Sequence, residues 1–423
     1  MTTTRAALRR PTTLAALALP LALLTACAGS PADAPTSEPS ASEVAEASDA
    51  RETATLEPRL VLTYDGGLQV LDATTLETLA DLPLDGFNRI NEAGDGRHVL
   101  VTTKDGFTVL DTGVWAEAHG DHAHYYAADP ELTGTTFTAE KPGHVVPHGE
   151  RTALFDDGTG AVTVIDSEHV ADGPEGARTF TTPSAHHGVA VELEDGTVVV
   201  SEGTEDARTG IRVLDAGGTE VDRSDACPGV HGEAVAADEA VVVGCQDGVL
   251  VYRAGTITKV ASPDAYGRIG NQAGTEASPV VLGDYKSDPD AELERPTRVS
   301  LVDTVAGTLQ LVDLPASYSF RSLARGADGS ALVLGTDGAL HVIDPLTGRL
   351  ERSAPVVGPW TEPDDWQQPR PTVRVLDGMA YVTDPEQRRL HVVDPATGEI
   401  WKSVELTITP NELTGVLGGT HSH

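Results

Sequence analysis

The stretch LQVLD at residues 68–72 decides the fold of this chain, because the same pattern returns until near the end of the sequence. Apolar residues at its first, third and fourth positions precede an Asp, and such period-two alternation indicates a half-buried strand. A turn such as Asp65-Gly66-Gly67 comes before most copies, and glycine accepts the positive φ of a tight hairpin. The other copies are FTVLD (107–111), VTVID (162–166), IRVLD (211–215), VSLVD (299–303), LQLVD (309–313), LHVID (340–344) and LHVVD (390–394).

The spacing of the copies predicts a ring of similar sheets. The copies at 299–303 and 309–313 lie so close that we expect one hairpin, and 249–252 is a degenerate copy. Eight units then recur at about 40–55 residues, which is the spacing of propeller blades. We predict an all-β chain folded as an eight-bladed β-propeller, with seven blades as the alternative. Because residues 410–414 resemble 87–91, the C-terminal strand is expected to complete the first blade and close the ring.

Composition agrees with this fold and excludes one class of partner. The 423 residues include 43 Gly and 27 Pro, which favours a turn-rich β body. The net charge of −36 repels phosphate, so we expect no nucleic-acid binding. Walker, dinucleotide, G-x-S-x-G and H-E-x-x-H motifs are absent from the sequence, so we expect no enzyme activity.

The N-terminus has the pattern of a bacterial export signal. A basic start precedes an apolar run at 14–24 that is too short to span a bilayer. Leu24-Thr25-Ala26-Cys27 resembles a lipobox, which implies cleavage before Cys27 and lipidation of its thiol. We expect a signal peptide over 1–26, a lipidated Cys27 with a disordered tether over 27–58, and one propeller domain over 59–423. The protein is expected outside the cytoplasm, with the lipid as its only anchor to the outer face of the cell membrane.

Two further cysteines, Cys227 and Cys245, remain in the propeller region. Outside the cytoplasm such a pair is expected to form a disulfide. The alternative is a pair of thiolate metal ligands, but no nearby C-x-x-C spacing supports it.

The segment His119-Gly120-Asp121-His122-Ala123-His124 carries the chemistry most typical of a site. It lies in a stretch, 112–143, without a clear strand pattern, which we interpret as a long functional loop. Imidazole is a common ligand of zinc and copper, and side-chain alternation places His122 and His124 on one side. His119 joins them if the chain turns back at Gly120. The alternative is a solvated polar loop.

The C-terminal His421-Ser422-His423 forms a second H-x-H pair. Ring closure is expected to bring it near the His119 segment, so His421 or His423 is a candidate fourth ligand. The local carboxylate candidates are Asp121 and Asp129. The alternative is a frayed terminus without a role.

Three more histidines, His144, His187 and His231, are each expected to open an innermost strand. We expect them to line the mouth of the central channel. They either form a second polar site or donate structural hydrogen bonds to neighbouring blades.

Four blocks of sequence together resemble a known family: HGDHAHYY (119–126) followed by PELTG, KPGHVVPHGERTALFDDGTGAVTVID (141–166), AHHGVAVELEDG (185–196) and CPGVHGEAVAADEAVVVGC (227–245). They are similar to the AztD family of extracytoplasmic zinc metallochaperones, over most of 59–423. The resemblance implies a β-propeller that binds Zn²⁺ and passes it to the solute-binding protein of a zinc ABC importer. It also implies that His119, His122, His124 and His421 or His423 are the ligands. We expect a monomer.

This chain departs from the family in that its tether contains no His. Its lipobox also indicates a membrane-tethered protein. From the residues alone copper and zinc are not distinguished, and two other functions stay open. One is a metal-assisted lyase or hydrolase that uses the channel-mouth histidines, and the other is a protein-interaction scaffold.

Overall fold

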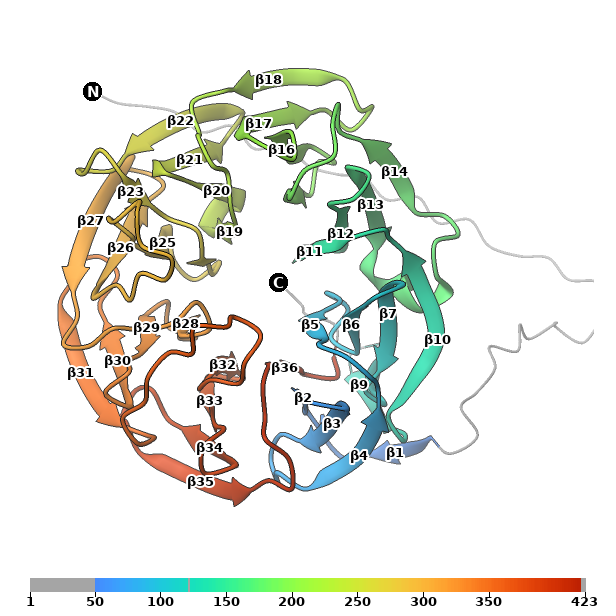
Figure 1. The fold of residues 1–423 in the computed structure, drawn as a ribbon. Helices are drawn as coiled ribbons and strands as arrows, with labels where there is room; N and C mark the ends of the chain where they lie inside the picture. Colours follow the sequence, from blue (N-terminus) through green and yellow to red (C-terminus); the bar gives the residue numbers. More distant parts are fainter. Residues whose placement is uncertain (1–49, 121, 420–423) are drawn as a thin grey trace, which may run out of the picture. The chain divides into compact units, whose positions relative to one another are not determined.

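Copies of the LQVLD pattern, except the one at 309–313, form the third strand, counted from the centre, of a series of antiparallel sheets. The computed structural model describes residues 50–120 and 122–419. Within this part, eight sheets have four consecutive antiparallel strands each, and Figure 1 shows them arranged around a common centre. The copies at 299–303 and 309–313 form one hairpin, β26–β27, as predicted. The protein is therefore an all-β chain with a propeller-like arrangement of sheets.

The strands of the first four sheets, from the innermost outward, have the following bounds. The first has β36 (Leu413–Val416), β2 (Arg59–Tyr64), β3 (Gly67–Asp72) and β4 (Thr78–Pro83); the second β5 (Arg89–Glu92), β6 (His98–Thr103), β7 (Gly106–Asp111) and β10 (Glu131–Thr138); the third β11 (Pro142–His148), β12 (Arg151–Asp156), β13 (Ala161–Asp166) and β14 (Arg178–Thr181); the fourth β15 (Ala190–Glu192), β16 (Val198–Gly203), β17 (Arg208–Leu214) and β18 (Glu220–Ser224).

The remaining four sheets follow in the same order. The fifth has β19 (Glu233–Ala236), β20 (Ala240–Cys245), β21 (Asp247–Arg253) and β22 (Thr256–Ala261), with β23 (Gly267–Arg268) parallel to β21; the sixth β24 (Gln272–Ala273), β25 (Val280–Asp284), β26 (Arg298–Asp303) and β27 (Thr308–Asp313); the seventh β28 (Leu323–Arg325), β29 (Ala331–Leu334), β30 (Ala339–Ile343) and β31 (Leu350–Pro355); the eighth β32 (Val373–Leu376), β33 (Met379–Asp384), β34 (Arg389–Val393) and β35 (Ile400–Glu405). Two short 3₁₀ helices, η1 (Ser167–Asp172) and η2 (Ala237–Glu239), lie in connections.

The middle strands are buried on both faces because each sheet packs between two neighbours. Alternate residues of β2 show this: Leu62 packs in a cluster with Leu390 of the eighth sheet, and Val61 with Val99 of the second. Each such fully buried aliphatic side chain stabilises the fold by about 2 kcal/mol. The outer strands β4 and β35 are mostly exposed, which explains why the apolar pattern is strongest in the third strand.

The Asp that ends the repeated pattern has a structural role in the turn that follows. The Oδ1 atom of Asp72 accepts the backbone N–H groups of Thr74 and Thr75 at 2.9 and 2.6 Å. Asp303 does the same for the two N–H groups after the third strand of the sixth sheet. The carboxylate satisfies turn donors that would otherwise lack partners, which favours Asp at this place.

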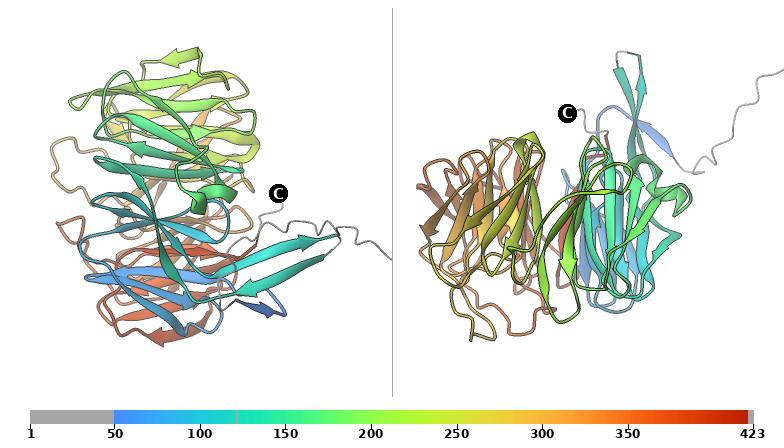
Figure 2. Two further views of the ribbon diagram at one scale, coloured as in Figure 1. Left: turned by 90° about the vertical axis from the view of Figure 1, so that its right-hand side faces the viewer. Right: turned by 90° about the horizontal axis from the view of Figure 1, so that it is seen from above.

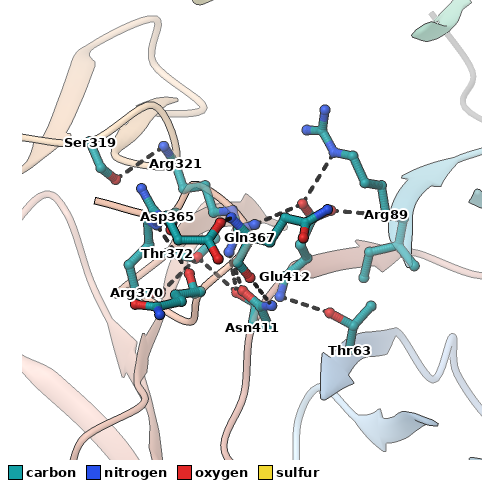
Figure 3. Close-up of polar contacts among 12 residues, drawn as sticks. Thr63, Arg89, Ser319, Arg321, Asp365, Gln367, Arg370, Thr372, Asn411 and Glu412 are labelled. Atoms are coloured by element: carbon teal, nitrogen blue, oxygen red, sulfur yellow. Dashed lines mark hydrogen bonds and ion pairs between the residues drawn. The ribbon is translucent and has the colours of Figure 1, made fainter. Parts of the chain in front are cut away.

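The C-terminal strand β36 lies in the first sheet, antiparallel to β2, with Leu413 opposite Leu62. Glu412, just before it, links segments far apart in sequence, as Figure 3 shows. Its carboxylate pairs with Arg89 at 3.2 Å and with the buried Arg321 at 3.1 Å, and its backbone N–H donates to Thr63 Oγ1 at 3.0 Å. The two ends of the domain are thus joined by both backbone and side-chain bonds.

A ninth sheet stands apart from the others and projects from the body (Figure 2). It consists of β1 (Arg51–Thr53), β9 (His122–Ala127) and β8 (Val114–His119), in that order. The interpretation of 112–143 as a long loop was therefore wrong: it contains a hairpin, β8–β9, and the outer strand β10. Residues 51–53, which the sequence analysis placed in the tether, form the third strand of this sheet.

Cys227 and Cys245 form a disulfide, as predicted, with an S–S distance of 1.95 Å across a separation of 18 residues. A loop of this length stabilises the fold by about 3 kcal/mol in the chain-entropy account. This pairing leaves no thiolate ligand at either position.

The signal peptide, Cys27, most of the tether, Asp121, His421 and His423 lie outside the described residues. Within the described part of the chain, no helix has the length and apolar character needed to cross a membrane.

Candidate metal site

The three histidines of the opening cluster meet at the tip of the β8–β9 hairpin. His119 ends β8 and His122 begins β9, and the two are direct cross-strand partners. Gly120, with φ of 67°, takes the left-handed conformation that the tight turn requires. His122 and His124 share one face of β9, as the alternation predicted, and the turn brings His119 onto them. The ring centroids lie 5.1, 5.4 and 5.1 Å apart, so the three imidazoles form a nearly equilateral group.

The spacing of the nitrogens suits a metal ion. One ligand atom from each of the three imidazoles lies within 4.8 Å of the others, and among the described residues this is the only such His, Cys, Asp or Glu group. His119 Nδ1 and His124 Nε2 are 3.3 Å apart. In a tetrahedral zinc site with Zn–N bonds of 2.0–2.1 Å, ligand nitrogens are about 3.3 Å apart. The arrangement therefore fits three of the four ligands of a zinc ion, and the exposed tip leaves the fourth position accessible.

Glu52 on β1 completes the surroundings of His124. Its Oε1 lies 2.6 Å from His124 Nδ1, on the side of the ring opposite to the nitrogen that faces His119. An imidazole that donates its Nδ1–H to a carboxylate keeps Nε2 as a lone pair, which fixes its tautomer for metal binding. Sequence reasoning missed Glu52, because it lies 72 residues away in a segment with no periodic pattern.

Aromatic contacts hold the hairpin in place at its base. Trp115 of β8 and Tyr126 of β9 stack with ring centroids 5.4 Å apart, and the Arg97 guanidinium lies 4.2 Å from the Trp115 ring centroid. Arg97 in turn binds Asp111, at the end of β7, with Nε–Oδ1 at 2.9 Å. Cation–π and cross-strand aromatic pairs each contribute about 1 kcal/mol. The tip is therefore exposed while the base is fixed to the second sheet.

His98, buried at the start of β6, makes the stability of the region around the base of the hairpin depend on pH. Burial lowers its pKa, but hydrogen bonds and charge from Asp111 and Asp95 outweigh burial and raise the pKa to about 9. Because the folded-state pKa lies above the unfolded value of 6.5, the stabilisation is complete below pH 6.5 and is lost as pH rises through 9. The shift corresponds to roughly 3 kcal/mol.

We expect the thermal midpoint of the wild type to fall between pH 6.5 and 9, and His98→Gln to remove that part of the fall. Differential scanning calorimetry across this range measures it. His169→Gln, an exposed histidine on η1, is the matched control and should retain the wild-type pH dependence. Parallel curves for wild type and His98→Gln would contradict the expectation.

The described residues limit the choice of a fourth ligand. Asp129 is exposed beyond the far end of β9, so the hairpin does not bring it to the tip. At the C-terminus, Gly418 donates its N–H to Gly96 O at 2.8 Å, and a Cβ at Gly418 would meet Val114 Cγ2 at 2.5 Å. The described chain therefore ends beside the first residue of β8.

The second group of histidines meets among the innermost strands. His144 and His187 have ring centroids 5.1 Å apart, and His231 lies 5.2 Å from His187 and 6.2 Å from His144. In each ring Nδ1 already faces an acceptor. His144 Nδ1 lies 3.0 Å from Glu233, His187 Nδ1 2.5 Å from Asp157 Oδ2, and His231 Nδ1 2.6 Å from Gly270 O. Nε2 is therefore the nitrogen left for a ligand in all three rings.

The three rings differ in their charge. Burial lowers the pKa of His144, but the nearby Glu233 carboxylate outweighs it and the net shift is upward. Burial lowers the pKa of His231 well below its usual value, and the positive charges of His144 and Arg268 lower it further. A neutral His231 is the form that binds metal. This group is looser than the hairpin group, because its donor atoms are not all within 4.8 Å of one another.

The chain is similar in sequence and in structure to a known protein. No protein-family model matches the chain. The sequence is 26% identical over 368 residues to the zinc chaperone AztD of Citrobacter koseri, a match that covers 84% of this chain and 85% of the relative. The crystal structure of C. koseri AztD superposes with a TM-score of 0.75 at 25% identity, over 87% of this chain and all of that chain (100%). Apo AztD from the same organism gives 0.74 at 24% identity, over 86% and 98%. The chain thus resembles the zinc chaperone AztD in sequence and in structure.

A more distant likeness concerns the fold alone. The dihydro-heme d1 dehydrogenase NirN in complex with DHE has a TM-score of 0.55 at 14% identity, over 85% of this chain and 75% of that chain. Propeller-like architecture is therefore shared with a protein of different chemistry.

Proposed function

We propose that this protein is a non-enzymatic zinc carrier that loads Zn²⁺ on the β8–β9 hairpin. The observation that supports this most directly is the group of His119, His122 and His124, whose donor atoms lie within 4.8 Å of one another, with one pair of nitrogens 3.3 Å apart. The curated relative is named a zinc chaperone and not an enzyme, which agrees with the expected lack of catalysis. Three imidazoles with a Glu52 carboxylate behind one of them suit zinc, which prefers nitrogen ligands in four-coordinate sites.

The position of the site supports delivery to another protein. His119 and His122 are exposed at the end of a projecting hairpin, so an acceptor protein can replace their ligand atoms one at a time. We propose that the acceptor is the solute-binding protein of a zinc ABC importer. A scaffold function, in which the metal is incidental, requires no transfer.

Transfer is tested by mixing the zinc-loaded protein with a metal-free solute-binding protein of such an importer and following zinc in the acceptor. Transfer faster than the release of zinc to an excess of a small chelator is expected, because direct ligand exchange avoids free zinc. Equal rates for acceptor and chelator would favour simple dissociation over delivery. Retention of tight zinc binding without any transfer would favour a scaffold or store.

We propose His421 or His423 as the fourth ligand. An extended chain spans about 3.3–3.6 Å per residue, so five residues beyond Gly418 reach about 17 Å. That is about the length of β8 from Val114, beside Gly418, to His119 at the tip. Removing the last three residues should weaken zinc binding more than replacing Ser422 by Ala.

A second zinc site at His144, His187 and His231 is also proposed. Their Nδ1 atoms are all directed to acceptors, which is how metal-binding histidines are commonly oriented. The structural alternative is that these hydrogen bonds only hold neighbouring sheets together. His187→Ala/His231→Ala should lower the zinc stoichiometry by one per chain if the site is real.

The organisation proposed for the whole chain is as follows. Residues 1–26 are a signal peptide, Cys27 carries the lipid that anchors the protein to the outer face of the cell membrane, and a tether leads to a monomeric domain. The eight four-stranded sheets are the blades of an eight-bladed propeller whose ring β36 closes. Pairing of β36 with β2 and packing of Leu62 beside Leu390 support the closed ring.

Glu52 offers a specific test of the hairpin site. Replacing it with Gln removes the carboxylate from His124 Nδ1, and the loss of such a partner lowers metal affinity by roughly 10–100-fold. Zinc affinity is measured by competition with a chromophoric chelator. The thermal midpoint of the metal-free protein should stay unchanged, since Glu52 is exposed.

The matched control for this test is Glu131→Gln, an exposed glutamate at the start of β10. It should bind zinc as the wild type does. If Glu131→Gln and Glu52→Gln weaken binding equally, the effect is general surface charge and not orientation of His124.

A further inference from the structure

A cavity of about 510 Å³ opens beside the second group of histidines. Its walls come from innermost strands and from the connections around residues 286–296 and 362–370. Cavities of this size hold small organic molecules. The zinc site proposed at His144, His187 and His231 involves only a few of the residues that line this cavity.

Two cations in this cavity lie opposite each other without acceptors. Arg268 and Lys286 form an isolated antiparallel bridge, with backbone N–O distances of 2.8 and 2.9 Å. Residues directly opposite in such a pair project to the same side, and like charges there are destabilising. Within the described residues neither side chain makes a hydrogen bond or an ion pair, in a chain whose net charge is −36. A like-charge pair that the abundant acids of this chain leave unpaired indicates a place for an external anion.

The carboxylates that line the cavity accept hydrogen bonds from other groups, although the Lys286 charge also counteracts the burial that raises the pKa of Glu362. Asp284 accepts the backbone N–H groups of Gly270 and Asn271 at 2.6 and 3.1 Å, and Glu362 pairs with Arg370 at 3.0 Å. The other carboxylates of the lining, Glu233, Glu294 and Asp364, likewise have protein partners. Arg268 and Lys286 are therefore left without a hydrogen-bonded carboxylate of their own in the cavity.

Phe320, Trp366 and Leu293 add apolar surface to the lining of the cavity. Phe320 is held between two guanidinium groups, those of Arg321 at 5.1 Å and Arg370 at 4.9 Å from its ring centroid. Trp366 is 51% exposed and Leu293 is half-buried beside it in the lining. Apolar walls favour a ligand with a carbon skeleton over a bare inorganic anion.

We propose that this cavity binds a small organic di- or tricarboxylate. Its carboxylates pair with Arg268 and Lys286, and its carbon skeleton lies against Phe320 and Trp366. A guanidinium fork matches a carboxylate in a bidentate manner, and the ammonium adds a point charge. The inference deepens the proposed second site, because a bound carboxylate faces His231 and can complete the coordination of a metal there. It does not depend on that metal.

The test uses the metal-free full-length protein with citrate as the probe, measured by titration calorimetry and by Trp366 fluorescence. Citrate binding should weaken by about tenfold or more in Arg268→Gln/Lys286→Gln, since a hydrogen bond to a charged group contributes about 1.5–3 kcal/mol. Arg253→Gln/Lys259→Gln removes the same charge from surface ion pairs outside the cavity, and it should bind citrate as the wild type does.

Four results would overturn the proposal: no citrate binding by the wild type, equal weakening in the two double variants, equal affinity for sulfate and citrate, or binding of an acidic peptide in place of citrate. The third indicates an inorganic oxyanion site and the fourth a protein partner. Zinc binding at the hairpin is measured separately in the same variants. Because His122 and His124 lie on another sheet, failure here leaves the zinc-carrier proposal standing.

Discussion

His122→Ala/His124→Ala is expected to lose tight zinc binding at the β8–β9 hairpin while keeping its fold. These two imidazoles supply two of the three donor nitrogens that meet at the hairpin tip. Apparent zinc binding energies of about 10–16 kcal/mol spread over four ligands give roughly 3 kcal/mol per ligand. Removing two therefore lowers affinity by at least about a thousandfold. Chelator competition and equilibrium dialysis measure the affinity and the number of ions bound.

The control for this result is His169→Ala, which removes an exposed imidazole from η1. Its zinc affinity should match the wild type, and circular dichroism of all variants should be the same because the tip contributes nothing to the core. The channel-mouth histidines retain a second site in our proposal, so one residual, separable binding event is expected. Two unchanged tight sites in the double variant would refute the hairpin as a zinc site.

Glu412→Ala is expected to cause the largest loss of stability. The side chains of Glu412 and Arg321 are 8% and 5% exposed, and the carboxylate also accepts the backbone N–H of Ile90 at 3.2 Å. Burial lowers the pKa of Arg321 to about 10, and Glu412 counteracts that burial. Breaking a buried pair by removing one partner costs about 3–5 kcal/mol, since the other charge stays buried. For a domain of this size the thermal midpoint should fall by about 5 °C.

The matched control is Glu405→Ala at the exposed end of β35, which should leave the thermal midpoint unchanged. Glu412→Ala should also make the C-terminal strand more accessible to protease, because the glutamate connects the start of β36 to Arg89. A midpoint equal to that of the control would show that Asn411, which also contacts Arg321, suffices to compensate its charge.

Much of the fold could be predicted because one short apolar pattern recurs, although the alternation indicated half-buried strands and the structure buries these strands on both faces. The third strands carry the strongest pattern, since both faces of each sheet meet a neighbour and the Asp at the end caps the turn. The disulfide followed from cysteine count and compartment. The hairpin could not be predicted in this way. Near its tip one face carries His and Glu and the other only the small Ala118 and Ala123, so β8 and β9 have no large apolar residues there to mark a strand.

The histidine cluster was found from local spacing, and its geometry was only half predictable. His122 and His124 share a face in any strand, but His119 joins them through a turn that a loop interpretation left open. Glu52 illustrates the limit of local patterns. Its contact with His124 depends on the pairing of β1 with β9, and nothing in a three-residue strand within an Ala/Ser/Pro-rich segment signals that pairing.

The pairing of β1 with β9 has a consequence for where zinc is handed over. The chain enters the domain at the sheet that carries His122 and His124, not at the opposite side of the body. In our proposal Cys27 carries the lipid, and the 23 residues between it and Arg51 set an upper limit of about 80 Å on the distance from the anchor to β1, since an extended chain spans at most about 3.3–3.6 Å per residue. The histidines would then stay close enough to the membrane for a membrane-bound acceptor to meet a raised local concentration of donor. A longer segment would lower that local concentration without changing any zinc ligand.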